Sequence, residues 1–162
     1  MTREGEMTGT GLTREWVERR LALSATYWVV TVREDGRPHA TPVWGVWQDD
    51  AVWFGTGDDT VKGRNLRARP GCVVHLESGD DVVILEGEAE RVADFAPGAM
   101  PADAERAVRA LAAKYAMPAE TMAGAESSAG LYRLRPRRVR AWLEPLFVES
   151  RVRWEPWVPL AA

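Results

Sequence analysis

The residues best suited to chemistry lie between positions 56 and 65. They combine hydroxyls, a glycine, two cations and an amide: Thr56, Gly57, Thr60, Lys62, Arg64 and Asn65. This combination suits an anion such as phosphate, because a helix N-terminus offers free backbone N–H groups while hydroxyls and cations add hydrogen bonds. The same spacing also fits a capped helix with solvated charges, so spacing alone leaves both interpretations open.

Lys62 is unusual in this chain. Of 21 basic Lys and Arg residues, only Lys62 and Lys114 are lysines. A compact ammonium on a flexible stem approaches a phosphate with a geometry that a planar guanidinium does not share. Lys114 belongs to an Ala-rich segment expected to be helical, and we expect it to be solvated.

Other common catalytic signatures are absent from the sequence. It contains no Gly-x-Gly-x-x-Gly opening a helix, no Walker A loop and no His-Glu-x-x-His. Cys72 and His75 fall three apart on one expected strand and point to opposite faces, which argues against a zinc site there. His39 is expected at the surface or at an interface, with a proton donor to substrate as the alternative. No catalytic residue can be assigned.

Composition narrows the class of protein. The chain has 162 residues, 46% of them hydrophobic, which fits one domain with a substantial core. The net charge of −3 argues against a nucleic-acid partner. The sequence has neither a long apolar run for a membrane span nor a secretory leader. Its single cysteine, Cys72, is expected to be buried and inert and favours a cytoplasmic location.

The periodicity predicts an α+β protein made mainly of β-strands. Residues 1–11 are expected to be a flexible tail, and residues 12–162 a single domain. Helices are predicted at 13–23 with Thr13 as N-cap, at 60–69 and at 102–116. Strands are predicted on both sides of the Asp35-Gly36 turn and at 51–57, 72–78, 81–92 and 130–145, with a short last strand near the C-terminus. Pro136 is expected at a break or an edge.

These elements sum to six or seven antiparallel strands with two or three peripheral helices, which favours a small β-barrel. Trp44 and Trp47 fall on one expected strand and would face opposite sides. One ring could then line a ligand cleft while the other packs in the core. The eight Trp residues as a group are expected in a core, a cleft or a subunit interface.

The order of several motifs resembles the pyridoxamine 5′-phosphate oxidase-like, split β-barrel family that binds flavins and deazaflavins. The motifs are D-G-R-P before a strand, T-P-V-W on it, W-F-G-T on the next strand, then K-x-x-N-L and a proline, over about residues 26–93. A weaker match covers "YRLRPRRVRAW". Members of this family are typically homodimers, with FMN or the deazaflavin coenzyme F-420 in a cleft between subunits.

The resemblance implies a role for each matching position. Lys62 matches the basic residue at the cofactor phosphate, and Arg64 is either a second contact there or a surface residue. Thr56, Gly57 and Thr60 match the strand end and hydroxyl beside the phosphate. The strand along the cofactor ring is matched by Thr41, Pro42, Val43 and Trp44. Trp142 and Arg153 match, loosely, residues that close the cleft from the partner subunit.

Two departures argue against oxidation of pyridoxamine 5′-phosphate itself. The oxidase proper carries an Arg where this chain has Ala40-Thr41, and a Ser-Arg-Lys triplet where this chain has Thr60-Val61-Lys62. Each departure removes a positive charge from the phosphate site.

The resemblance therefore implies an FMN- or F-420-dependent oxidoreductase that transfers hydride to or from a small organic substrate. Proximity of the stacked rings then matters more than an acid–base pair. The alternative is a flavin or deazaflavin carrier with little turnover on the same fold. A haem-handling relative is a third possibility, with His39 and His75 as the sole candidate ligands.

Overall fold

The computed structural model describes residues 7–8, 11–94, 100–117 and 129–158. Within these ranges eight strands form one sheet in the order β4-β3-β7-β8-β9-β6-β5, and β10 pairs with β9 beside this path. All of the pairings are antiparallel. The mainly β fold with peripheral helices is confirmed.

The chain enters through two short strands, β1 (Met7–Thr8) and β2 (Gly11–Leu12), and then α1 (Arg14–Leu23). Thr13 caps α1 as predicted, because its hydroxyl accepts the N–H of Trp16 at 3.2 Å. The buried face of α1 consists of Trp16, Val17 and Leu21. Most of the tail predicted at 1–11 lies outside the described residues, and the boundary at residue 12 stays a prediction.

The next four strands roll the sheet into a barrel. β3 (Tyr27–Val32) and β4 (Pro38–Val43) form the hairpin predicted at Asp35-Gly36, and β5 (Gly45–Gln48) pairs with β6 (Ala51–Gly57). The strand predicted through Trp44 and Trp47 is therefore two strands, separated by Trp44. β4 and β5 lie at opposite ends of the strand order yet are joined by one residue, so the sheet must curl until its edges meet.

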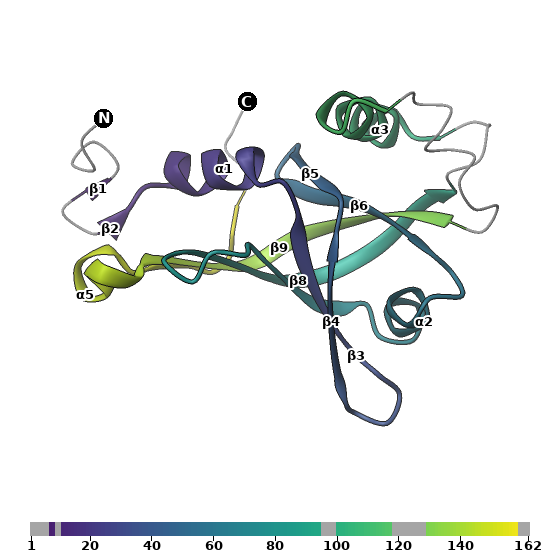
Figure 1. Cartoon of the computed structure of the whole chain (residues 1–162), viewed down its shortest axis with the longest axis horizontal. Helices are drawn as coiled ribbons and strands as arrows, with labels where there is room; N and C mark the ends of the chain where they lie inside the picture. Colours follow the sequence, from purple (N-terminus) through teal and green to yellow (C-terminus); the bar gives the residue numbers. More distant parts are fainter. Residues whose placement is uncertain (1–6, 9–10, 95–99, 118–128, 159–162) are drawn as a thin grey trace.

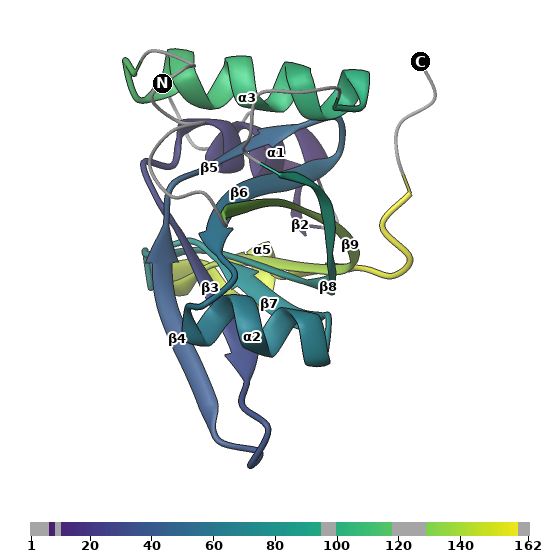
Figure 2. The ribbon, with the colours of Figure 1, turned by 90° about the vertical axis from the view of Figure 1, so that its right-hand side faces the viewer.

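The middle of the chain supplies two helices and two strands. The elements are α2 (Val61–Ala68), β7 (Gly71–His75), β8 (Asp81–Asp94) and α3 (Ala102–Lys114). α2 ends before Pro70, as predicted, since a residue preceding proline disfavours the helical conformation. Figure 2 shows α3 and α2 on opposite sides of the strands, with α2 beside β3, β4 and β7.

β9 (Ala129–Leu143) connects the two halves of the sheet. It pairs with β6 over residues 129–134 and with β10 (Val152–Trp154) over residues 139–141. Pro136 lies between these two pairings and opposite a register shift of β8 at Glu86/Gly87, so its missing N–H interrupts no regular ladder. The chain then passes through a 3₁₀ turn (Glu144–Leu146) and α5 (Phe147–Ser150).

The core is divided in two. The larger cluster fills the barrel and includes Tyr27, Phe54, Tyr132 and residues of α1. A second cluster, around Trp53 and Leu111, holds α3 against β5 and β6. The eight-stranded sheet exceeds the predicted six or seven strands because the run at 38–48 splits at Trp44. In the described part of the chain, no helix is long and apolar enough to cross a membrane.

Candidate functional site

A chain of hydrogen bonds links Lys62 to the end of β6. The Lys62 ammonium Nζ donates to Thr56 Oγ1 at 2.9 Å. The Thr60 hydroxyl gives its proton to the Gly57 carbonyl at 2.8 Å, so Thr56 must be the donor in the 3.0 Å contact between the two threonine oxygens. Each of the two hydroxyl protons in this chain has one acceptor, and the bond to Thr56 fixes the orientation of Lys62.

The N-terminus of α2 is packed directly onto the end of β6. Thr60 Oγ1 accepts the Gly63 N–H at 3.0 Å, and the Thr60 carbonyl accepts the N–H of Arg64. A Cβ on Gly63 would lie 2.2 Å from the Gly57 carbonyl oxygen, so only glycine allows this approach. Val61 and Lys62 carry the first-turn N–H groups for which a helix has no internal acceptor. Such groups suit an anion.

The Lys62 ammonium is a desolvated cation. Its side chain is half-buried, and burial lowers its pKa below the usual range. Among the described residues, every ion pair uses an arginine as the cation and none includes Lys62. A half-buried ammonium without a carboxylate gains most from a bound anion. The residues at this position therefore fit a phosphate group.

Several polar side chains near Lys62 in the sequence form hydrogen bonds with other parts of the chain. Asp58 accepts hydrogen bonds from Arg91 on β8 at 3.2 and 3.3 Å. Arg64 is exposed and donates to the Asp59 carbonyl. Asn65 is buried and donates to Thr31 Oγ1 of β3 at 2.9 Å, which ties α2 to the sheet. Thr60 is occupied by capping and by Gly57, so it positions the site without a free proton to offer.

β4 presents alternate residues to the interior beside α2. Thr41 and Val43 face inward, whereas Pro42 is exposed. Trp44 is 51% exposed and stacks on Tyr115 of the α3 C-terminus, with ring centroids 4.6 Å apart and planes within 8°. Trp44 thus neither lies on a strand nor packs in the core, because the chain turns there from β4 into β5.

The C-terminal end of α3 forms hydrogen bonds with the turn between β4 and β5. Lys114 Nζ donates to the Gly45 carbonyl at 2.8 Å, and the Gly45 N–H donates to the Tyr115 hydroxyl at 2.9 Å. Lys114 lies 4.8 Å from the centroid of the Tyr27 ring, and burial lowers its pKa to about 8. The prediction of a solvated Lys114 was wrong, since its helix ends against the β4–β5 turn.

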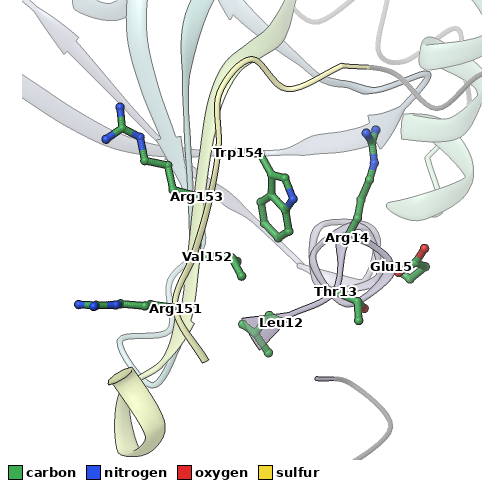
Figure 3. Close-up of a pocket in the computed structure, with 8 residues that line it drawn as sticks. All are labelled: Leu12, Thr13, Arg14, Glu15, Arg151, Val152, Arg153 and Trp154. Atoms are coloured by element: carbon green, nitrogen blue, oxygen red, sulfur yellow. The ribbon is translucent and has the colours of Figure 1, made fainter. Parts of the chain in front are cut away.

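Trp142 and Arg153 come together in a separate groove. The groove has a volume of about 390 Å³ and is lined by Arg140, Trp142, Phe147, Arg151, Val152 and Arg153. Figure 3 shows Arg151 and Arg153 pointing away from Val152 and Trp154, which face Leu12 and α1 across a second hollow. Trp142 meets the Phe147 ring edge to face, with centroids 5.7 Å apart.

We call Thr56, Gly57, Thr60 and Lys62 the Lys62 cluster. This groove and the Lys62 cluster lie at opposite ends of β9. Gly57 pairs with Ala129 at one end, and Val82 pairs with Trp142 at the other. In Figure 1, α2 and α5 are accordingly far apart along the long axis of the molecule. One copy of the chain does not bring the predicted late residues to Lys62.

His39 lies near Lys62, although the sequence favoured a surface or interface position and did not connect it with the phosphate site. It faces inward from β4, directly opposite Thr31, the acceptor of the Asn65 amide. Burial, with further contributions from Arg33 and Lys62, lowers the pKa of His39 below its usual value. The period-2 alternation with Thr41 and Val43 is the sequence signal that could have found it.

A rolled antiparallel sheet with peripheral helices defines a split-barrel protein. Residues 12–143 match the family model described as pyridoxamine 5′-phosphate oxidase. The chain belongs to this family, which confirms the resemblance seen in the sequence. No curated protein matches the chain.

Solved structures share the fold. A conserved hypothetical protein of Mycobacterium tuberculosis is 23% identical, with a TM-score of 0.70 and 97% of each chain covered. An F-420 reductase is 21% identical, with a TM-score of 0.60, covering 75% of this chain and 94% of its own. A heme binding protein from Mycobacterium smegmatis is 21% identical, with a TM-score of 0.61, covering 89% of this chain and 59% of its own.

Proposed function

We propose that the protein is an oxidoreductase that uses FMN or the deazaflavin coenzyme F-420 on a small organic substrate. In this proposal Lys62, with the first N–H groups of α2, holds the cofactor phosphate. Thr56, Gly57 and Thr60 fix the position of Lys62, and the backbone of the segment Thr41, Pro42, Val43 and Trp44 lies along the ring. The bound cofactor would supply hydride transfer through its central ring.

The observation that carries the proposal is the desolvated Lys62 ammonium, which has no carboxylate partner among the described residues yet is held in one orientation by Thr56. Membership of the family supports the class of ligand. The similarity to an F-420 reductase supports keeping the deazaflavin beside FMN as a candidate.

We further propose that the protein is a cytoplasmic homodimer whose cofactor cleft lies between subunits. Trp142 and Arg153 of the second copy would then close the cleft opened by Lys62 of the first. Their separation from Lys62 along β9 supports this arrangement. Arg64 has its guanidinium on the Asp59 carbonyl, so a phosphate contact from it would require a change of rotamer.

Side-by-side fluorescence titrations with FMN and F-420 test the cofactor. Binding of either cofactor below about 1 μM, followed by reduction and reoxidation with an acceptor, would support the oxidoreductase. Tight binding without measurable turnover would instead favour a carrier. If the protein bound neither FMN nor F-420 with micromolar or tighter affinity, both the oxidoreductase and the carrier would be overturned.

Lys62→Ala tests the phosphate contact directly. We expect the variant to weaken FMN binding by about 1.5–3 kcal/mol, the scale of a charge-assisted hydrogen bond, because Thr56 holds this half-buried ammonium at the helix start. The affinity for riboflavin, which lacks the phosphate, should change little.

Arg67→Ala is the matched control. Arg67 is exposed in the last turn of the same helix and donates to the Asp58 carbonyl, so its loss removes an equal charge from α2 without touching Lys62. If Lys62→Ala and the unmodified protein bound FMN with equal affinity, Lys62 would not contact the phosphate.

A further inference from the structure

His39 carries a buried nitrogen without a partner. Its Nδ1 has no solvent contact and makes no hydrogen bond with any described residue. The side chain as a whole is only half-buried. The open part of the ring is therefore the other edge, which carries Nε2.

The environment of Nδ1 selects one tautomer. A buried N–H without an acceptor costs more than a bare ring nitrogen, because the donor loses its hydrogen bond to water. The charged groups acting on the ring are Arg33, next to the β3–β4 hairpin, and Lys62 on α2, and both are cations. Two cations and a buried Nδ1 disfavour the imidazolium, so the neutral ring keeps its proton on Nε2.

The elements around His39 are those of the proposed phosphate site. α2 packs against β3, β4 and β6. His39 pairs across the ladder with Thr31, and Thr31 binds Asn65, which lies one helical turn after Lys62. His39 therefore lies on a strand against which α2 packs, and Lys62 is close enough to act on its ring electrostatically.

We propose that His39 is a further phosphate-binding residue, a neutral donor that presents Nε2–H to the anion beside Lys62. This inference rests on the function proposed above. A neutral donor adds a hydrogen bond without a third positive charge next to Lys62 and Arg33, which would repel one another while the site holds no anion. No proton is taken up when the anion binds.

Side-chain amides separate the two ring nitrogens. In His39→Gln the amide nitrogen can replace Nε2, whereas in His39→Asn it can replace only Nδ1. We expect the Gln variant to keep FMN affinity within about threefold of the unmodified protein, and the Asn and Phe variants to lose about tenfold or more. Riboflavin affinity should be the same in all four proteins.

The tautomer is tested without any cofactor by ¹⁵N NMR of the two histidines, with His75→Gln for assignment. We expect His39 to be neutral at pH 7 with its proton on Nε2, both free and with FMN. An Nδ1–H tautomer, equal losses in the Gln and Asn variants, or proton uptake on FMN binding would overturn the inference. If the unmodified protein bound neither FMN nor F-420, the proposed function would fail instead, and the tautomer result would still stand.

Discussion

At the scale of single residues, the two lysines differ from the arginines in what they contact. The described ion pairs all use arginine, whereas Lys62 donates to a threonine hydroxyl and Lys114 to a backbone carbonyl. Both ammonium groups are half-buried, and burial lowers the pKa of each. A lysine can tolerate partial desolvation by shifting its pKa, which an arginine scarcely does.

Lys114 should therefore make stability depend on pH. Its pKa is about 8 in the folded protein and near 10.4 when unfolded, so the unfolded state holds the proton more tightly. The free energy of unfolding should rise, relative to Lys114→Met, as the pH increases from about 8 to 10. The gain is about 1 kcal/mol after discounting for solvent screening.

Urea unfolding of both proteins at pH 7, 8.5 and 9.5 measures this difference. Tyr27, whose pKa burial raises, is present in both proteins and its contribution largely cancels. Parallel stability curves for the two proteins would show that Lys114 titrates near its ordinary value.

At the scale of elements, the position of α2 depends on a glycine. Gly63→Ala would place a methyl group 2.2 Å from the Gly57 carbonyl oxygen, and neither backbone segment can yield without moving the helix. We expect the variant to lose about 1–3 kcal/mol of stability, by overpacking. FMN affinity should fall at least about tenfold, because Thr60 and Lys62 move with the helix start.

Gly71→Ala is the control for this prediction. A Cβ at Gly71 meets nothing within 4 Å, and the residue begins the strand that follows α2. Urea unfolding measures the stability of both variants, and FMN titration measures their affinity for the cofactor. If Gly63→Ala matched the unmodified protein in both measurements, the close contact between α2 and β6 would be wrong.

Much of the order of helices and strands could be predicted, because interactions between residues close in the sequence determine it. Thr13 and Thr60 mark helix starts, and Asp35-Gly36 marks a hairpin, through interactions within a few residues. The break at Trp44 and the capture of Gly45 by Lys114 arise from contacts about 70 positions apart, so no local pattern carries them. For the same reason the sequence pointed to Lys62 but did not predict that His39 lies near it.

At the scale of the whole molecule, the sheet separates the parts of the proposed site. The Lys62 cluster and the groove of Trp142 and Arg153 lie at opposite ends of β9, near α2 and α5 respectively (Figure 1). A second copy related by a two-fold axis can place its groove against the first copy's cluster, and symmetry then creates two equal sites. Light scattering should accordingly give twice the 18.0 kDa mass of the chain.

Mixed dimers test whether the two parts form one site. Lys62→Ala and Trp142→Ala should each bind FMN weakly alone. A mixed dimer, however, contains one site with both native side chains. Random mixing after unfolding and refolding together should restore about a quarter of the tight sites. Arg153→Ala, an exposed change on β10, replaces Trp142→Ala if the latter folds poorly. A monomeric mass, or no tight sites in the mixture, would place the whole cofactor site within one chain.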